Sequence, residues 1–207
     1  VVLSAYQGHN ACLQLLLNAK ADISVASKDG STALVLAASR GHTECLQLLL
    51  VAKANINAKN QYGNTAAIIA ANHGHTACLQ LLLDAKASVD AANRWGNTAA
   101  IAAANDGHTA CLQVLMNAKA NIHAANEEGC TALILAANHG HSACLELLLE
   151  ANADVNATDK DGHTALMTAA HQGHTACLQL LVDVKHIIGK KATQPQRSRK
   201  KKDCIIS

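Results

Sequence analysis

The chain repeats one pattern of apolar and polar residues with a period of 33 positions. Each period holds a short run of alanine and leucine that ends in Gly-His. A second run follows, in which cysteine and leucine recur at intervals of three and four residues. This spacing predicts helices, and a fixed period of this length predicts a stack of like units. The glycine of the Gly-His pair occurs six times, at Gly8, Gly41, Gly74, Gly107, Gly140 and Gly173.

The unit at residues 28–60 shows the elements that we expect in every repeat. Gly30 predicts a turn, Thr32 is a favourable N-cap for a helix over residues 33–39, and Gly41 predicts a left-handed end to that helix. Thr43 is expected to cap the second helix. The positions predicted to be buried are Leu34, Leu36, Ala37, Ala38, Cys45, Leu46, Leu49 and Leu50.

Both helices are too short to be stable alone, so stacking on neighbouring units supplies most of the stability. We expect one elongated repeat domain over residues 1–189, followed by a disordered tail over residues 190–207. Val1 falls just inside a first helix, and we therefore expect the chain to be a fragment of a longer protein. The predicted repeats are 1–27 (partial), 28–60, 61–93, 94–126, 127–159 and 160–189.

The unit resembles the ankyrin repeat, whose pattern runs D-G-x-T-P-L-H-L-A-A, then G-H, L-L-L and A-D-V-N-A. The resemblance covers residues 1–189 in one register. It implies an all-α ankyrin-repeat solenoid, in which a helix-turn-helix alternates with a β-hairpin-like loop, and a concave face that binds a protein partner.

Three positions depart systematically from that family pattern. The family proline is alanine and the family histidine is apolar, as in Ala33 and Val35. The family glycine after the second helix is lysine or asparagine, and a left-handed non-glycine residue there costs about 1 kcal/mol. These residues are Lys20, Lys53, Lys86, Lys119, Asn152 and Lys185.

The positions that differ between repeats are the candidates for partner binding. They lie at the hairpin tips, after each turn glycine (including Ser31 and Cys130) and at the ends of the first helices. Tyr62 and Trp95 are the strongest candidates for aromatic anchors, with Arg94 beside them; the alternative is that the tips are simply solvated. The predicted set is Lys28, Asp29, Arg40, Gln61, Tyr62, Asn64, His73, Arg94, Trp95, Asn97, Asp106, Glu127, Glu128, His139, Lys160, Asp161 and His163.

Cysteines and histidines recur at fixed phases, which favours structural roles. One cysteine per repeat is expected to be buried and unbridged, in a reducing compartment, at Cys12, Cys45, Cys78, Cys111, Cys144 and Cys177. The six Gly-His histidines are predicted to be structural. His73, His139, His163 and His171 are expected to be more exposed. We predict no enzyme activity, catalytic residue, metal site or cofactor, and neither a nucleic acid nor a small-molecule substrate as partner.

Charge divides the chain into an acidic body and a basic tail. Residues 185–207 carry eight basic residues and one acidic, a net charge of +7, whereas residues 1–184 carry nine basic and fourteen acidic, a net charge of −5. The last four residues fit C-a-a-X, which predicts farnesylation of Cys204. A single lipid binds a bilayer only marginally, so basic residues supply a second signal. They are Lys190, Lys191, Arg197, Arg199, Lys200, Lys201 and Lys202.

These observations predict an adaptor in the cytoplasm, held at a membrane surface by its tail. Two alternatives remain open from the sequence. The basic cluster also fits a nuclear localisation signal of a soluble or nuclear adaptor. The repeats also fit the targeting module of a larger protein, such as a ubiquitin ligase, a kinase or a bacterial effector that uses host prenylation.

Overall fold

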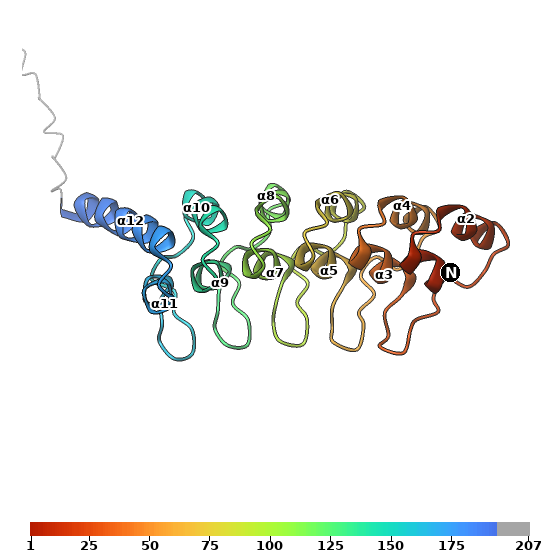
Figure 1. The fold of residues 1–207 in the computed structure, drawn as a ribbon, viewed down its shortest axis with the longest axis horizontal. Coiled ribbons are helices and arrows are strands. Elements are labelled where there is room, and N and C mark those ends of the chain that lie inside the picture. Colours follow the sequence, from red (N-terminus) through yellow and green to blue (C-terminus); the bar gives the residue numbers. More distant parts are fainter. Residues whose placement is uncertain (194–207) are drawn as a thin grey trace, which may run out of the picture.

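The computed structural model describes the chain over residues 1–193 and its side chains over residues 1–185. Figure 1 shows the helices of this part in two parallel rows, with loops projecting from one side. The fold confirms the predicted all-α solenoid. The twelve helices of residues 1–193 pair as α1 (Val2–Gln7) with α2 (Asn10–Asn18), α3 (Ala33–Arg40) with α4 (Thr43–Val51), α5 (Ala66–Asn72) with α6 (Thr76–Asp84), α7 (Ala99–Asn105) with α8 (Thr109–Asn117), α9 (Ala132–Asn138) with α10 (Ser142–Glu150), and α11 (Ala165–Gln172) with α12 (Thr175–Thr193).

Threonine caps begin the first helix of each repeat from α3 onward, as predicted. The side chain of Thr98, for example, accepts the backbone N–H of Ile101 at 3.3 Å. α3 ends at Arg40, one residue beyond the predicted end, and Gly41 follows it with φ of 71°. Both ends of the helix are therefore encoded locally, by a hydroxyl that satisfies a free N–H group and by a glycine that tolerates positive φ.

The predicted cap of the second helix was wrong. His42 is the N-cap of α4, without a side-chain cap bond, and Thr43 is already helical. The Thr43 hydroxyl donates to the carbonyl of Gly41 at 3.3 Å and lies 3.6 Å from Sγ of Cys78 in the next repeat. In the next two repeats the hydroxyl of Thr76 lies 3.3 Å from Sγ of Cys111, and that of Thr109 lies 3.3 Å from Sγ of Cys144. This threonine therefore links adjacent repeats instead of starting a helix.

The core is a thin layer of alanine from the first helices and of cysteine and leucine from the second. Leu46, Leu79, Leu112 and Leu145 are fully buried. Two predicted core leucines, Leu36 and Leu50, are only half-buried. Cys12 is exposed, contrary to prediction, because α2 lies at the end of the stack and α4 is its only outer neighbour there.

Non-glycine residues occupy the left-handed position after the second helices, as expected. Lys20, Lys53, Lys86, Lys119 and Asn152 have φ between 55° and 68°. In the last repeat α12 continues to Thr193, so Lys185 is helical and the helix extends past Gly189, where we expected the repeats to end. The backbone of Lys190 and Lys191 is part of this helix. The other predicted tail residues, Arg197, Arg199, Lys200, Lys201, Lys202 and Cys204, lie outside the described residues.

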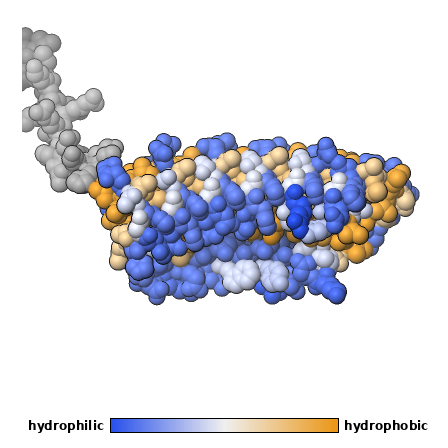
Figure 2. Space-filling model, in the orientation of Figure 1, coloured by the Kyte–Doolittle hydropathy of each residue, from blue (hydrophilic) through white to orange (hydrophobic). Residues whose placement is uncertain are grey.

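Apolar surface gathers at the ends of the solenoid. Figure 2 shows hydrophobic residues at both ends of the visible face and a mostly hydrophilic surface between them. Leu3 is 70% exposed at the first end, and Met167 is 50% exposed at the other. In the repeats that lie between, the residue equivalent to Met167 is covered by the next helix pair. Over the described residues, none of the helices is long and apolar enough to cross a bilayer.

Candidate functional site

The loops that project from the helices form one continuous row. A backbone N–H at each tip donates to a carbonyl of the preceding tip: Arg94 to Tyr62 at 3.0 Å, and Glu127 to Trp95 at 2.8 Å. These bonds lie between repeats, so they hold neighbouring tips in register. Side chains at the tips are thus presented from a rigid edge.

A ladder of asparagine side chains supports the tips from below. Oδ1 of Asn93 accepts the backbone N–H groups of Trp95 and Asn97, both at 3.0 Å. Its Nδ2 donates to Oδ1 of Asn64 in the preceding repeat at 2.9 Å. Asn126 repeats this arrangement one unit later, donating to Asn97 at 3.0 Å. Each rung therefore closes its own loop and also joins two repeats.

Asn64 and Asn97 belong to the predicted partner-binding set, whereas the asparagines that bond to them were not predicted, although the sequence carries their signal. An asparagine or aspartate stands three residues before the turn glycine in four successive repeats, at Asn60, Asn93, Asn126 and Asp159. Ser31, expected on the concave face, is buried, and its hydroxyl accepts from Nδ2 of Asn60 at 3.3 Å.

The two predicted aromatic anchors lie together on this rigid edge. The rings of Tyr62 and Trp95 stack with centroids 6.1 Å apart and planes inclined by 17°. Tyr62 is 43% and Trp95 is 50% exposed. Offset aromatic pairs of this separation attract each other. The pair therefore forms a fixed hydrophobic platform that remains open to solvent.

The other predicted partner-binding residues are spread along the tips and the ends of the first helices. All seventeen are exposed except Asp29, Asn64 and Asn97, which are half-buried. The guanidinium of Arg40 lies 4.4 Å from the centre of the Tyr6 ring. His73 and His139 stack on His75 and His141 of their own repeats instead of forming one cluster. The predicted set is therefore a row of positions rather than one compact site.

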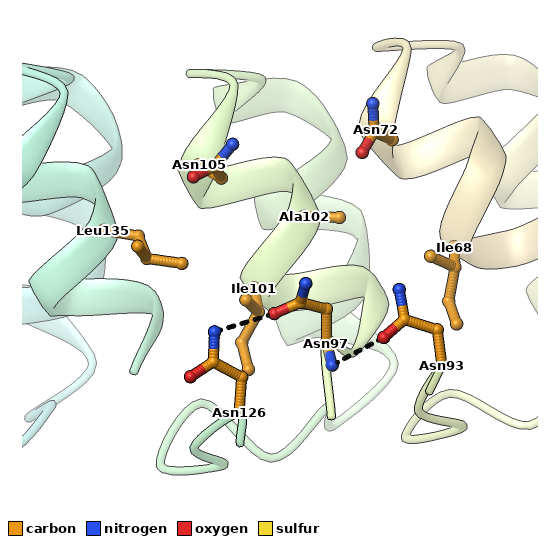
Figure 3. A pocket seen from close by; sticks show the side chains of 9 residues that line it. All are labelled: Ile68, Asn72, Asn93, Asn97, Ile101, Ala102, Asn105, Asn126 and Leu135. Atoms are coloured by element: carbon orange, nitrogen blue, oxygen red, sulfur yellow. Dashed lines mark hydrogen bonds between the residues drawn. The ribbon is translucent and has the colours of Figure 1, made fainter. Parts of the chain in front are cut away.

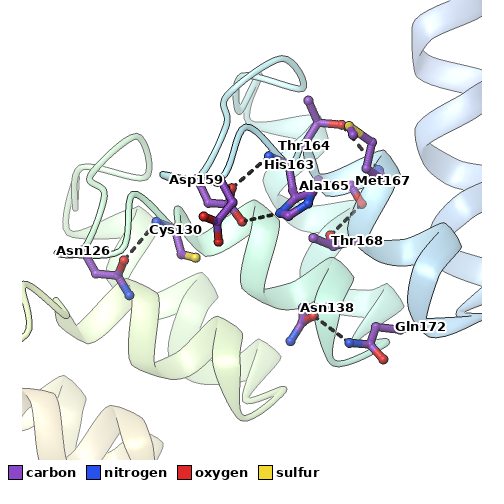
Figure 4. A network of polar contacts seen from close by, with 11 residues as sticks. Asn126, Cys130, Asn138, Asp159, His163, Thr164, Ala165, Met167, Thr168 and Gln172 are labelled. Carbon is purple, nitrogen blue, oxygen red and sulfur yellow. Dashed lines mark hydrogen bonds and ion pairs between the residues drawn. The ribbon is translucent and has the colours of Figure 1, made fainter.

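The asparagine ladder is broken at its last rung (Figure 4). Asp159 faces Cys130, and no hydrogen bond joins these two side chains in the described part of the chain. Oδ1 of Asp159 accepts the N–H groups of Asp161 and His163 at 3.0 and 2.8 Å, which closes the loop as asparagine does. Burial raises the pKa of the Cys130 thiol, and the nearby carboxylate of Asp159 raises it further. This thiol is therefore neutral and poorly reactive.

Repairing this rung tests what the ladder contributes to stability. The variant that combines Cys130→Asn with Asp159→Asn restores the rung. Its free energy of unfolding is expected to be about 1 kcal/mol higher than the effects of the two single substitutions add up to, which is the usual net value of one hydrogen bond. A double-mutant cycle in urea unfolding measures this coupling. A coupling of zero would show that the rungs orient the loops without stabilising the stack.

Five of the six Gly-His histidines, His42, His75, His108, His141 and His174, join adjacent repeats at the ends of the first helices, which confirms their predicted structural role. His9, in the first repeat, is exposed and makes no such contact among the described residues. Nε2 of His108 lies 3.1 Å from the carbonyl oxygen of Asn72, and His141 lies 3.0 Å from that of Asn105. Each imidazole packs against the glycine of the preceding repeat: a Cβ added at Gly74 would lie 2.7 Å from Nδ1 of His108. Glycine is needed here for space as well as for its positive φ.

The packing of His75 makes stability depend on pH. Burial lowers the pKa of His75, and the hydrogen bond to Ser39 opposes that shift. In the unfolded chain the imidazole of His75 has the ordinary histidine pKa of about 6.5. Stability is therefore complete above that pH and falls as the pH decreases towards the folded pKa. Urea unfolding at pH 7.5 and 5.5 measures how much the free energy of unfolding falls between the two pH values. We expect a smaller fall for His75→Gln than for the wild type. An equal fall in the two proteins would contradict the role of His75 in this pH dependence.

A polar pocket lies in the groove between the first helices and the loops (Figure 3). It has a volume of about 150 Å³ and no charged lining residue. The amides of Asn93, Asn97 and Asn126 lie at its lower edge, and those of Asn72 and Asn105 lie at its upper edge. The remaining lining residues are Ile68, Ile101, Ala102 and Leu135.

One group of described residues has ligand atoms close enough for a metal. Asp159, Asp161 and His163 bring one ligand atom each within 4.8 Å of one another. Nδ1 of His163 already lies 3.3 Å from Oδ2 of Asp159, and Oδ1 of that carboxylate closes the loop. These contacts account for all three residues as parts of a turn, and we assign no metal to them.

Stacked helix pairs with joined loops and an open groove define a repeat scaffold. Comparison with known proteins identifies the family. Residues 1–93 and 85–159 match a pattern of three ankyrin repeats, and residues 161–188 match a single ankyrin repeat. The chain belongs to the ankyrin repeat family, whose members are typically non-enzymatic scaffolds for protein–protein interaction.

A solved structure supports the same assignment. The crystal structure of an ankyrin repeat domain from Acinetobacter baumannii AYE matches with a TM-score of 0.80 and 30% sequence identity. The match covers 88% of this chain and 96% of that one. No curated protein sequence matches the chain significantly.

Proposed function

We propose that the row of loop tips and the adjoining groove bind a protein partner, with Tyr62 and Trp95 as the central anchor. The observation that carries this proposal is the stacked, half-exposed aromatic pair on a hydrogen-bonded edge. Tyrosine, tryptophan and arginine dominate the energetics of protein interfaces. Arg94 is next to Trp95 in sequence and exposed at the same tip. Because the tips are held in register, little conformational entropy is lost when a partner binds.

Replacing the tryptophan tests this proposal. Trp95→Ala is expected to weaken binding by about 2 kcal/mol or more, roughly 30-fold, because truncation of an aromatic anchor typically costs this much. Proximity labelling with the wild-type chain identifies the partner, and calorimetry with the purified partner measures the affinity. Leu15→Ala is the matched control, since Leu15 is 69% exposed on α2, an outer helix. Equal affinity for both variants would reject the aromatic anchor.

We further propose that the tail holds this adaptor at the cytoplasmic face of a membrane. The support is the sequence: a cysteine followed by two isoleucines and serine, directly after a basic run. Figure 1 shows α12 running away from the loop tips, so a membrane reached from the end of this helix leaves the groove accessible. The proposal requires Ser207 to be the C-terminal residue. The basic run also suits nuclear import, which is the competing outcome.

Intact mass spectrometry of the protein from eukaryotic cells tests the modification directly. A mass increased by one prenyl group on Cys204 supports the proposal. An unmodified mass would contradict the proposed lipid anchor and leave an adaptor without one.

A further inference from the structure

The pocket in the groove restricts the chemistry of the partner. Five of its nine lining residues are asparagines and the other four are apolar. A lining without formal charge offers no compensation for a buried charge on the ligand. The segment that enters this pocket is therefore uncharged there, and its contacts are hydrogen bonds and apolar packing.

The asparagine ladder fixes which polar atoms face the ligand. Oδ1 of Asn97 accepts from Nδ2 of Asn126, and Oδ1 of Asn64 accepts from Nδ2 of Asn93. The Nδ2 groups of Asn64 and Asn97 have no hydrogen-bond partner among the described residues. In Figure 3 the nitrogen of Asn97 points away from the ladder into the pocket. Asn97 lines the pocket, and the ladder bonds the Oδ1 of Asn64 in the same way, so we infer an equivalent N–H donor at Asn64, one repeat before Asn97.

The spacing expected for donors on neighbouring repeats suits one backbone conformation of a ligand. Neighbouring stacked helices lie about 8–10 Å apart. A polyproline II helix has three residues per turn and rises about 3.1 Å per residue, so carbonyl groups on one side recur every ~9 Å. In a β-strand, carbonyls on one side recur every second residue, about 7 Å. Polyproline II carbonyls make no internal hydrogen bonds and remain free to accept.

The aromatic pair is carried by the same loops as the two donors. The loop that carries Trp95 is closed by Asn93, and Trp95 lies two residues before Asn97 in sequence. Exposed aromatic rings are the surface on which proline-rich segments pack, because the flat rings complement the pyrrolidine rings. Donors one polyproline turn apart and an adjacent aromatic pair therefore favour the same ligand.

We propose that the groove binds an uncharged, proline-rich segment of the partner in the polyproline II conformation. Asn64 and Asn97 donate to two main-chain carbonyls of the segment that are three residues apart. The Tyr62–Trp95 pair packs against a proline of the segment that lies between those two carbonyls. This inference rests on the proposed function, because it names the class of segment that the same face recognises. It assigns Asn64 and Asn97 a role in recognition besides their place in the ladder.

One isosteric substitution separates the two roles of Asn97. In Asn97→Asp, the introduced carboxylate still accepts from Asn126, so the rung remains, but the N–H donor towards the groove is lost. Asn117→Asp is the matched control: Asn117 is exposed on α8, and its Oδ1 accepts from Gln113 at 3.1 Å. Both variants add the same charge to the same repeat and keep their internal hydrogen bond. Circular dichroism and urea unfolding check that both remain folded.

The probe is a phage library of random 12-residue peptides selected on the wild-type protein. The enriched peptides are synthesised with a fluorophore, and their binding is measured by fluorescence anisotropy. We expect uncharged sequences with prolines spaced by three, bound at least 10-fold more weakly by Asn97→Asp and by Trp95→Ala, with unchanged affinity for Asn117→Asp. Because these peptides are uncharged, the loss does not come from repulsion between formal charges, and it reports the replacement of a donor by an acceptor at this position.

Two other outcomes are each decisive. Charged or helix-forming peptides that need Trp95 but tolerate Asn97→Asp would overturn this inference and leave the proposed function intact. Peptides whose binding depends on neither Trp95 nor Asn97 would overturn both, because the selected site would then lie outside the groove.

Discussion

Gly96→Ala is expected to destabilise the solenoid by about 1–3 kcal/mol more than Gly162→Ala, the range typical of overpacking. Both glycines occupy the same turn position, with φ of 77° and 82°, so both variants carry the same left-handed strain of about 1–2 kcal/mol. They differ in what the new methyl group meets. At Gly96 a Cβ would lie 2.9 Å from the backbone nitrogen of Glu127, whereas at Gly162 nothing lies within 4 Å.

The backbone of the next repeat cannot move freely at this point. The N–H of Glu127 donates to the carbonyl of Trp95 at 2.8 Å, and Asn126 beside it forms a rung of the ladder. Relieving the clash therefore weakens two connections between repeats. The excess cost at Gly96 measures how rigidly neighbouring loops are joined.

Urea unfolding followed by circular dichroism measures this difference. The m-value shows whether the repeats still unfold together, since a solenoid whose repeat interfaces weaken loses cooperativity. A lower m-value is expected for Gly96→Ala and an unchanged one for Gly162→Ala. Equal losses in the two variants would mean that the loops are not coupled and that only the glycine conformation matters.

The sequence predicts what each repeat encodes within itself. The Thr32 cap, the Gly41 helix end and the buried Leu46 all follow from local propensity and from the 33-residue period. The predicted cap at Thr43 and the predicted burial of Cys12 were both wrong. In the first case the local signal was ambiguous, and in the second the neighbouring repeats determine the exposure. Thr43 stands next to a helix start as Thr32 does, but its hydroxyl bonds outside the helix. Cys12 has the same local sequence as Cys78 and is exposed because α2 has a neighbour on only one side.

The candidate site depends on contacts between repeats, and these are harder to read from the sequence. The positions of Tyr62 and Trp95 differ by one period, so their proximity was predictable, although their stacking was not. The asparagine three residues before the turn glycine, at Asn60, Asn93 and Asn126, was visible as a pattern. Only the structure shows that its amide reaches the preceding repeat, which determines how Asn64 and Asn97 orient their donors.

Cys204→Ser is expected to release an N-terminally tagged protein from membranes in eukaryotic cells. A serine hydroxyl is not prenylated, and the basic run alone binds an anionic leaflet weakly in the presence of physiological salt. A single lipid is also insufficient alone, with a partition constant of only about 10⁴ M⁻¹ for a myristoyl chain. Both parts of the tail are therefore needed, and removal of either should shift the protein off the membrane.

The basic residues give this prediction a second, graded test. Replacing Lys200, Lys201 and Lys202 with glutamine should weaken membrane binding by about 3 kcal/mol, because each contributes roughly 1 kcal/mol near an anionic surface. That loss corresponds to a factor of roughly 100 in the partition constant. Cys12→Ser is the matched control, since Cys12 is an exposed cysteine in a different sequence context.

The location of the released protein decides between the remaining functions. Diffuse signal for Cys204→Ser and membrane signal for the wild type and Cys12→Ser support a lipid-anchored adaptor. Nuclear signal for both the wild type and Cys204→Ser, lost when the three lysines are replaced, would reject the anchor and assign the basic run to import. In either case α12 runs away from the loop tips as far as Thr193, so this helix leaves the loop tips and their aromatic pair uncovered.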